Sequence, residues 1–324
     1  MRNYSYHSSI AENLKGFVDY KRALGYKYDS EAYQIHCFDR YWTEANGQNT
    51  EITYDSLKGW MERRPGESIS SRSARISVIR QLAFYMNGTG MAAYVPMEKY
   101  KKEHPVVHVL SAEEIRALFE SIDSYMPRRY PTFSVRMRAE YKVIFRLILT
   151  TGLRRSEAVS IRIRDVDWSA GTITIYDGKG NKDRLVYMSV DMAALLKEYV
   201  EYLFGFVHSE TEWLFPSFRI EEHVSGIGLA QKFKNYWKMT PYAKTCEKDP
   251  TIHSLRHTYV VFRMNLWIAH GADTNVMLPY LSRQLGHKSP DETFYYYHQV
   301  RDSFRIIQEK DSLSSTVLPE VRVR

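Results

Sequence analysis

Apolar residues recur every three or four positions along most of the chain, which is the spacing of an amphipathic α-helix. In the first hundred residues this spacing predicts four short helices, each with one apolar face. The predicted core positions are Ile10, Leu14, Phe17, Val18 and Leu24, then Ala32, Ile35, Phe38, Trp42 and Ala45, then Leu57, Trp60 and Met61, and last Ile76, Ile79, Ala83 and Met86. Residues 1–100 are therefore predicted to form a small helical domain.

The segment from Pro96 to Val109 interrupts this pattern with two prolines and a basic run. Such a segment is typical of a boundary, because proline cannot continue a helix. Ser111 and Glu114 then have the spacing of a capping box, which marks the start of a new helix. We predict a linker over residues 101–109 and a second domain from residue 110 to residue 312.

One stretch of the second domain alternates with a period of two. Thr172–Tyr176 and Arg184–Met188 alternate on either side of the glycine-rich turn Asp177–Lys182, which predicts a β-hairpin. Helical spacing resumes and continues to about Ser312, and residues 313–324 are predicted to be a tail. The fold class is therefore mainly α with a small β-hairpin or sheet.

Composition narrows the class of protein. The formal net charge of +7 favours a polyanionic partner, because Lys and Arg displace counterions condensed on phosphates. No segment reaches the roughly 20 apolar residues of a membrane helix, and the first residues do not resemble a secretory signal. With only two cysteines, a disulfide framework or a cysteine-rich zinc site is not expected. We expect a soluble cytoplasmic protein that does not contact a membrane.

Three basic residues are candidate DNA contacts. Arg72 and Arg75 lie at the beginning of the fourth predicted helix, where arginines dock a helix on a groove or simply remain solvated. Lys182 lies in the turn of the predicted hairpin.

The candidate chemistry lies in three separate segments of the second domain. In TGLRRSEAV, Arg154 lies near a helix N-terminus, where its charge adds to the helix dipole and suits a phosphate; a surface pair with Glu157 is the structural alternative. In TIHSLRHTYV, His253 and Arg256 share one helical face. In LGHKSPDETFYYYHQV, His287 precedes Tyr296 by nine residues.

Together these segments resemble the tyrosine recombinase, or phage integrase, family, in the two-domain form of mobile-element and Xer-like enzymes. The family signature is an Arg in T-G-x-R-x-x-E, a hairpin Lys, an H-x-x-R pair, a His in L-G-H and a Tyr shortly beyond. The matching residues are Arg154, Lys179, His253, Arg256, His287 and Tyr296. The resemblance covers roughly residues 110–312 and implies a mostly helical catalytic domain, preceded by a helical, SAM-like core-binding domain.

The resemblance implies a role for each residue. Arg154 and Arg256 would clamp the phosphate and neutralise its charge as a metal does elsewhere, with His253 and His287 donating hydrogen bonds or moving protons nearby. The implied enzyme needs no metal, ATP or other cofactor.

The resemblance also implies the acid and the nucleophile. Lys179 would protonate the leaving 5′ oxygen, and Tyr296 would attack the phosphorus to form a 3′-phosphotyrosine. Lys182 competes with Lys179 for the first role, and Tyr295 and Tyr297 compete with Tyr296 for the second. On a helix the neighbouring tyrosines would each point about 100° away, so only one of the three faces the phosphate.

The implied partners are double-stranded DNA at specific recombination sites and further copies of the chain. Within the family, four protomers assemble on two DNA sites and exchange a C-terminal helix, which would correspond to Arg301–Ser312 here.

Other functions have weaker support. The chain could be a DNA-binding accessory protein that lost strand exchange, or a relaxing enzyme similar to type IB topoisomerases. GKGNK lacks the spacing of a nucleotide-binding P-loop, and the histidines do not form the helix pair of a metallonuclease.

Overall fold

The computed structural model describes residues 3–98, 107–126, 132–176, 183–206, 211–287, 289 and 291–294. The chain separates into two compact units, Met1–Pro105 and Val106–Arg324. The first unit ends inside the segment for which a linker is predicted.

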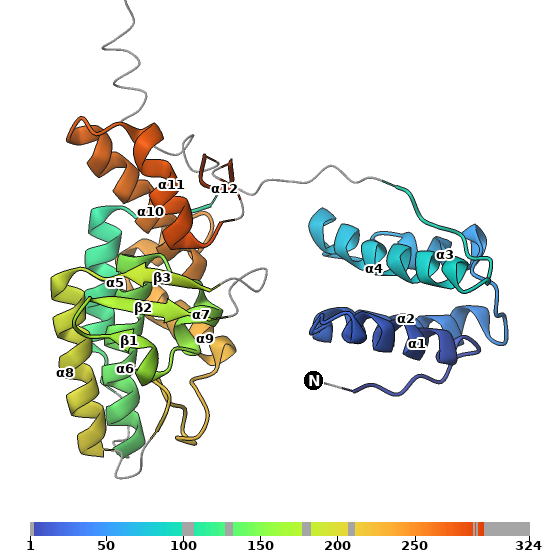
Figure 1. Cartoon of the computed structure of the whole chain (residues 1–324), viewed down its shortest axis with the longest axis horizontal. Coiled ribbons are helices and arrows are strands. Elements are labelled where there is room, and N and C mark those ends of the chain that lie inside the picture. The colour runs from blue at the N-terminus through green and yellow to red at the C-terminus, as the bar shows by residue number, and fades with distance from the viewer. Residues whose placement is uncertain are drawn as a thin grey trace, which may run out of the picture. The chain divides into compact units, whose positions relative to one another are not determined.

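Four helices make up the described part of the first unit (Figure 1). They are α1 (Ala11–Ala23), α2 (Asp29–Asn46), α3 (Tyr54–Met61) and α4 (Ile69–Gly88). Their apolar faces meet in one core that contains both buried tryptophans of the unit, Trp42 and Trp60. The four-helix prediction is thus confirmed.

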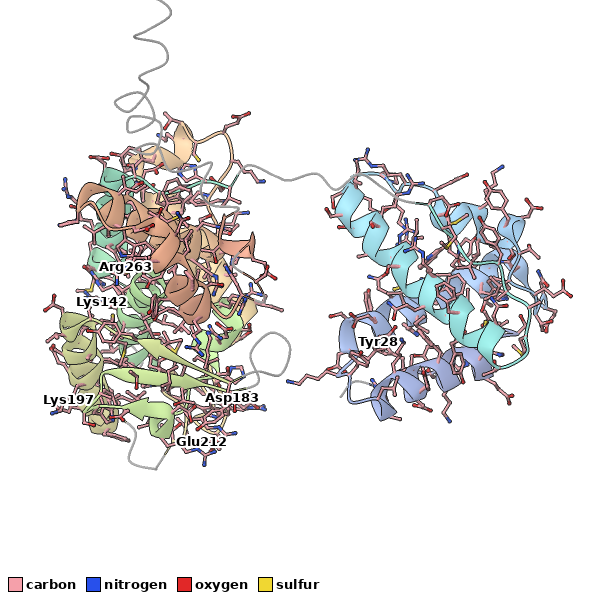
Figure 2. The ribbon with its side chains drawn as sticks, turned by 45° about the horizontal axis from the view of Figure 1, so that its top comes forward. Tyr28, Lys142, Asp183, Lys197, Glu212 and Arg263 are labelled. Atoms are coloured by element: carbon pink, nitrogen blue, oxygen red, sulfur yellow. The ribbon has the colours of Figure 1, made fainter. Side chains whose placement is uncertain are left out.

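Two predicted core positions are wrong. Leu24 is 55% exposed because α1 ends at Ala23, so the residue lies beyond the helical face. Ala45 is exposed in the last turn of α2. The residue that packs into the core between α1 and α2 is Tyr28. It has a left-handed backbone (φ 49°) at the start of α2, and its buried ring contacts the Phe17 ring edge to face (Figure 2).

The structure gives Arg75 a role inside the first unit. Its guanidinium is 3% exposed, pairs with Glu67 at 2.7 Å and donates to the carbonyls of Trp60 and Glu62. Arg72 is half-buried and donates from Nε to the Met61 carbonyl at 2.8 Å. Because a buried, paired guanidinium is costly to detach, Arg75 is better explained as a brace for the loop between α3 and α4 than as a DNA contact.

The second unit is mostly helical with one small sheet, as the sequence predicts (Figure 1). Its helices are α5 (Ala112–Ser124), α6 (Thr132–Thr151), α7 (Arg155–Val159), α8 (Val190–Phe206), α9 (Gly226–Met239), α10 (Ile252–Ala269), α11 (Thr274–Leu285) and α12 (Asp291–Phe294), with 3₁₀ turns η1 (Ile163–Asp165) and η2 (Pro241–Lys244). The predicted capping box of α5 forms, since Ser111 Oγ accepts from the Glu114 amide and Glu114 accepts from the Ser111 amide.

The sheet has three antiparallel strands, one more than predicted. They are β1 (Val166–Asp167), β2 (Thr172–Ile175) and β3 (Arg184–Tyr187), in that order. Ile173 opposite Val186 faces the core, whereas Leu185 opposite Thr174 faces outward. Of the two residues of β1, Val166 is buried and Asp167 exposed, and two residues are too few to give a period-two signal.

Contacts between the sheet and the last helices position the candidate site. The Gln284 side chain of α11 accepts from the Tyr187 amide of β3 and donates to the Tyr187 carbonyl. Helix α10 packs on the central helix α6. Among the described residues, no helix has the length and apolar character needed to cross a membrane.

Candidate active site

The structure brings four of the six predicted catalytic residues to one region. Arg154 is the N-cap residue of α7, His253 and Arg256 share α10, and His287 follows the end of α11. Lys179, Lys182 and Tyr296 lie outside the described residues, as does the segment Arg301–Ser312.

Glu157 binds two arginines rather than one. Its carboxylate accepts from Arg154 Nη1 at 2.7 Å and from the Arg154 amide at 2.8 Å. It also accepts hydrogen bonds from both Nη groups of Arg184, at 3.0 and 2.8 Å. Glu157 is 7% exposed, so the pair with Arg154 is a partly buried brace instead of the surface pair considered as the structural alternative.

The charge state of Glu157 follows from these partners. Burial alone would raise its pKa, but the hydrogen bonds and charge of Arg184, with those of Arg154, outweigh burial and lower the pKa to about 2. The carboxylate is therefore ionised at neutral pH and holds both guanidiniums in place.

Three arginines bind three consecutive carbonyls at the C-terminal end of α11. Arg184 Nε donates to Gln284 at 2.9 Å, Arg256 Nη2 to Leu285 at 2.8 Å, and Arg154 Nη2 to Gly286 at 3.1 Å. The arginines come from β3, α10 and the start of α7.

A helix C-terminus leaves its last carbonyls without intrahelical partners and carries partial negative charge. Guanidiniums satisfy both needs, and each hydrogen bond to a charged group contributes about 1.5–3 kcal/mol. The end of α11 thus fixes the two predicted clamp arginines beside each other.

Gly286 is required by this geometry. Its φ of +64° is left-handed, which ends α11 and turns the chain toward His287. A Cβ at this position would lie 3.0 Å from the Arg184 guanidinium. The glycine of the L-G-H segment therefore has a backbone role, and it sets the direction in which the chain continues to His287.

Gly152 has a similar backbone role, in this case toward Arg256. Its carbonyl accepts from Arg256 Nη1 at 2.6 Å, and its φ is +72°. A Cβ there would lie 2.6 Å from Tyr259 and 2.8 Å from Leu285, both of which are buried. No side chain fits without moving the core that holds Arg256.

We expect Gly152→Ala to destabilise the protein by about 2–4 kcal/mol, from left-handed backbone strain together with overpacking. In a unit of this size that corresponds to a fall in the melting temperature of about 5–15 °C, measured by calorimetry. Gly205→Ala is the matched control: Gly205 lies in α8, its φ is not positive, and a Cβ there meets nothing within 4 Å. Equal melting temperatures for the two variants would contradict this account of Gly152.

Both ring nitrogens of His287 have a polar contact in the described part of the chain. Its Nε2 lies 3.0 Å from Arg256 Nη2, and its Nδ1 lies 2.7 Å from the hydroxyl of Thr293. Since a guanidinium only donates, Nε2 must accept, and Nδ1 then carries the proton and donates to Thr293. Thr293 is fully buried in this role. The contact orients Arg256 as well as His287.

His253 is one helical turn before Arg256. Its imidazole is accessible at the surface, yet crowding by protein atoms, then the charges of Arg256 and Arg154, lower its pKa. The rings of His253 and the buried His257 pack edge to face, with centroids 4.4 Å apart. Burial, and then His253 and Arg256, lower the pKa of His257 to about 3. Both imidazoles are neutral at pH 7.

Sequence reasoning missed Arg184 and the positioning role of Thr293. Arg184 belongs to none of the three motif segments. It begins β3, after the candidate hairpin lysine, so the alternating pattern indicates only a strand residue there. Within the described ranges no group of three or more His, Cys, Asp or Glu side chains is arranged to hold a metal ion.

Comparison with known proteins assigns this arrangement to a class. Residues 108–302 match the model of the phage integrase family. The chain belongs to that family and is a tyrosine site-specific recombinase by class.

Individual relatives agree with this assignment. The integrase/recombinase y4rB of Sinorhizobium fredii is 24% identical over 89% of the chain and 92% of its own length. The tyrosine recombinase XerC of Oceanobacillus iheyensis is 26% identical over 78% of the chain and 79% of its own length.

Solved structures show the same fold. The XerH recombinase bound to its difH substrate has a TM-score of 0.63 at 20% identity, and covers 87% of this chain and 79% of its own. The Tn1549 transposon integrase bound to transposon end DNA has a TM-score of 0.64 at 14% identity, and covers 92% of this chain and 99% of its own. The predicted fold class is thus confirmed.

Proposed function

We propose that the protein breaks and rejoins double-stranded DNA at specific sites through a 3′-phosphotyrosine at Tyr296, without metal or ATP. The observation that carries the proposal is the joint anchoring of Arg154 and Arg256 on adjacent carbonyls at the end of α11. Two guanidiniums fixed side by side suit the two non-bridging oxygens of one phosphate.

The charge of the reacting phosphate defines what the arginines do. Negative charge grows on the non-bridging oxygens as the nucleophile attacks, and preorganised donors stabilise it without reorganisation. Glu157, ionised and buried, holds Arg154 in position. His287 and the carbonyls of Gly152 and Leu285 hold Arg256. Neutral His253, one turn away, is able to donate a hydrogen bond to the same phosphate.

The remaining steps are assigned to residues outside the described part of the chain. Tyr296 attacks the phosphorus, and Lys179 protonates the departing 5′ oxygen. The phosphotyrosine stores the energy of the broken bond, so a 5′-hydroxyl from a partner strand reverses the step without ATP. Lys182 and Arg72 remain proposed DNA contacts.

The assembly is proposed from the same family pattern. The structural relatives are complexes with recombination-site and transposon-end DNA, which supports duplex DNA as the partner of this chain. In the proposed assembly, four protomers act on two sites and exchange Arg301–Ser312 between neighbours. A DNA substrate is consistent with a cytoplasmic enzyme, which is the proposed location.

The test is a covalent trap. The full-length protein is incubated in EDTA with labelled, nicked duplexes that tile the flanks of its own gene. An SDS-resistant, protease-sensitive adduct supports the proposal, and mass spectrometry of the DNA-linked peptide identifies the tyrosine. Site-specific binding with no adduct on any nicked duplex would contradict it, and would favour the DNA-binding accessory protein.

A further inference from the structure

A second cluster of reactive side chains lies outside the candidate active site. Cys246, just after η2, has its sulfur 3.6 Å from Nδ1 of His108. Nε2 of His108 lies 3.0 Å from both carboxylate oxygens of Glu114, in the first turn of α5. Cys246 and His108 are both partly exposed, so small molecules have access to the thiol.

The hydrogen bonds define where the protons are. A carboxylate only accepts, so Nε2 of His108 carries a proton and donates it to Glu114. In the neutral ring Nδ1 is then bare and faces the Cys246 sulfur, which makes it an acceptor for the thiol proton. The Lys248 carbonyl, 3.0 Å from the sulfur, is the other acceptor of that proton.

The base is held rigidly. Glu114 also accepts from the Ser111 amide at 2.8 Å, because it belongs to the capping box of α5. The ring of His108 packs edge to face on the buried Trp237, with centroids 6.0 Å apart. A nucleophile, a base and a group that orients the base thus occur in the order that activated thiols require.

We propose that Cys246 is a site of reversible thiolation by low-molecular-weight disulfides, with His108 as the base and Glu114 as its positioning residue. The sulfur of Cys246 attacks one sulfur of the disulfide as His108 takes the thiol proton. A new S–S bond forms, the original S–S bond breaks, and the leaving thiolate receives the proton from His108.

The place of this thiol gives the modification a consequence. His108 lies at the start of the second unit, and two residues later the Leu110 amide donates to Thr258 of α10 at 3.0 Å. Thr258 is two residues beyond Arg256. A group added to the sulfur would therefore lie beside the His108 ring, in the segment that Leu110 ties to α10.

The chain has only two cysteines, which makes the test direct. In full-length protein with Cys37→Ser, the rate of reaction of Cys246 with 5,5′-dithiobis(2-nitrobenzoate) is measured at pH 7. We expect His108→Ala to slow it at least about tenfold and Glu114→Gln to slow it severalfold, since both remove base assistance. His270→Ala, a change of the same kind at the far end of α10, should leave the rate unchanged.

The opposite outcome is also defined. An equal or faster rate in His108→Ala would show that the imidazole only covers the sulfur, and would overturn the proposal. A second measurement does not depend on that variant. Wild-type protein incubated with glutathione disulfide should carry the adduct on Cys246 before Cys37, as mass spectrometry reads it; thiolation of Cys37 first would also overturn the proposal.

Discussion

Tyr296→Phe is expected to bind its DNA site within about twofold of wild type and to form no covalent adduct. The substitution removes only the hydroxyl that attacks the phosphorus, so binding through backbone contacts persists while chemistry stops. Loss of a nucleophile typically costs more than about 10³-fold in rate. The measurement is adduct formation on nicked DNA in EDTA, beside a gel-shift titration of the same duplex.

Tyr295→Phe and Tyr297→Phe are matched controls, because each removes one hydroxyl from a neighbouring position. Both are expected to keep the adduct. If one of them loses it and Tyr296→Phe does not, the nucleophile is the neighbour, and the proposed chemistry stands with a different residue. Adducts in all three single variants would contradict a unique tyrosine nucleophile.

Local patterns predicted the helices well. The apolar stripes of α1 to α4 and the capping box of α5 depend on residues a few positions apart, and the structure places them as expected. The failures are local too. Leu24 fits the period of α1, but the helix ends one residue earlier, and periodicity alone does not locate a helix end.

The network around the arginines was out of reach for a different reason. Arg154 meets Gly286, and Arg256 meets Gly152, across more than a hundred residues of sequence. Spacing along the chain gives no information on such contacts. Motif resemblance pointed to Arg154 and Arg256, and the spacing allowed a pair of Arg154 with Glu157. Neither gave a sign that Arg184 shares that carboxylate or that the end of α11 holds all three arginines.

Arg75 illustrates the same limit in the first unit. Near a predicted helix start, the sequence does not distinguish an arginine that contacts DNA from an arginine that braces a loop. The difference lies in Glu67 and the carbonyl of Trp60, whose positions depend on how the loop between α3 and α4 folds back.

Arg256→Ala is expected to lower the rate of DNA cleavage by about 10³-fold or more. A preorganised donor on a reacting oxyanion contributes about 10²–10³ in rate, and an arginine on a transferring phosphoryl group 10³–10⁵. The Arg256 side chain is 1% exposed, and its removal leaves the buried carbonyls of Gly152 and Leu285 without this hydrogen-bond donor. The melting temperature should therefore fall as well. Single-turnover cleavage of a nicked site and calorimetry separate the two effects.

Arg256→Lys tests the chemistry with the positive charge retained. A lysine lacks the planar fork that reaches two carbonyls, His287 and a phosphate oxygen together, so cleavage should stay at least about 10²-fold below wild type. Arg263→Ala is the matched control, two turns further along α10, where the guanidinium lies 6.0 Å from the Tyr259 ring (Figure 2). It should cleave within about threefold of wild type.

The outcome that would remove Arg256 from the clamp is specific. A folded Arg256→Ala variant that binds DNA and cleaves within tenfold of wild type would mean that the guanidinium only ties Gly152, Leu285 and His287 together. Of the two proposed clamp arginines, Arg154 would then remain. Loss of cleavage in Arg256→Lys at an unchanged melting temperature would instead place the arginine on the reacting phosphate, because the packing role alone predicts that stability and activity fall together.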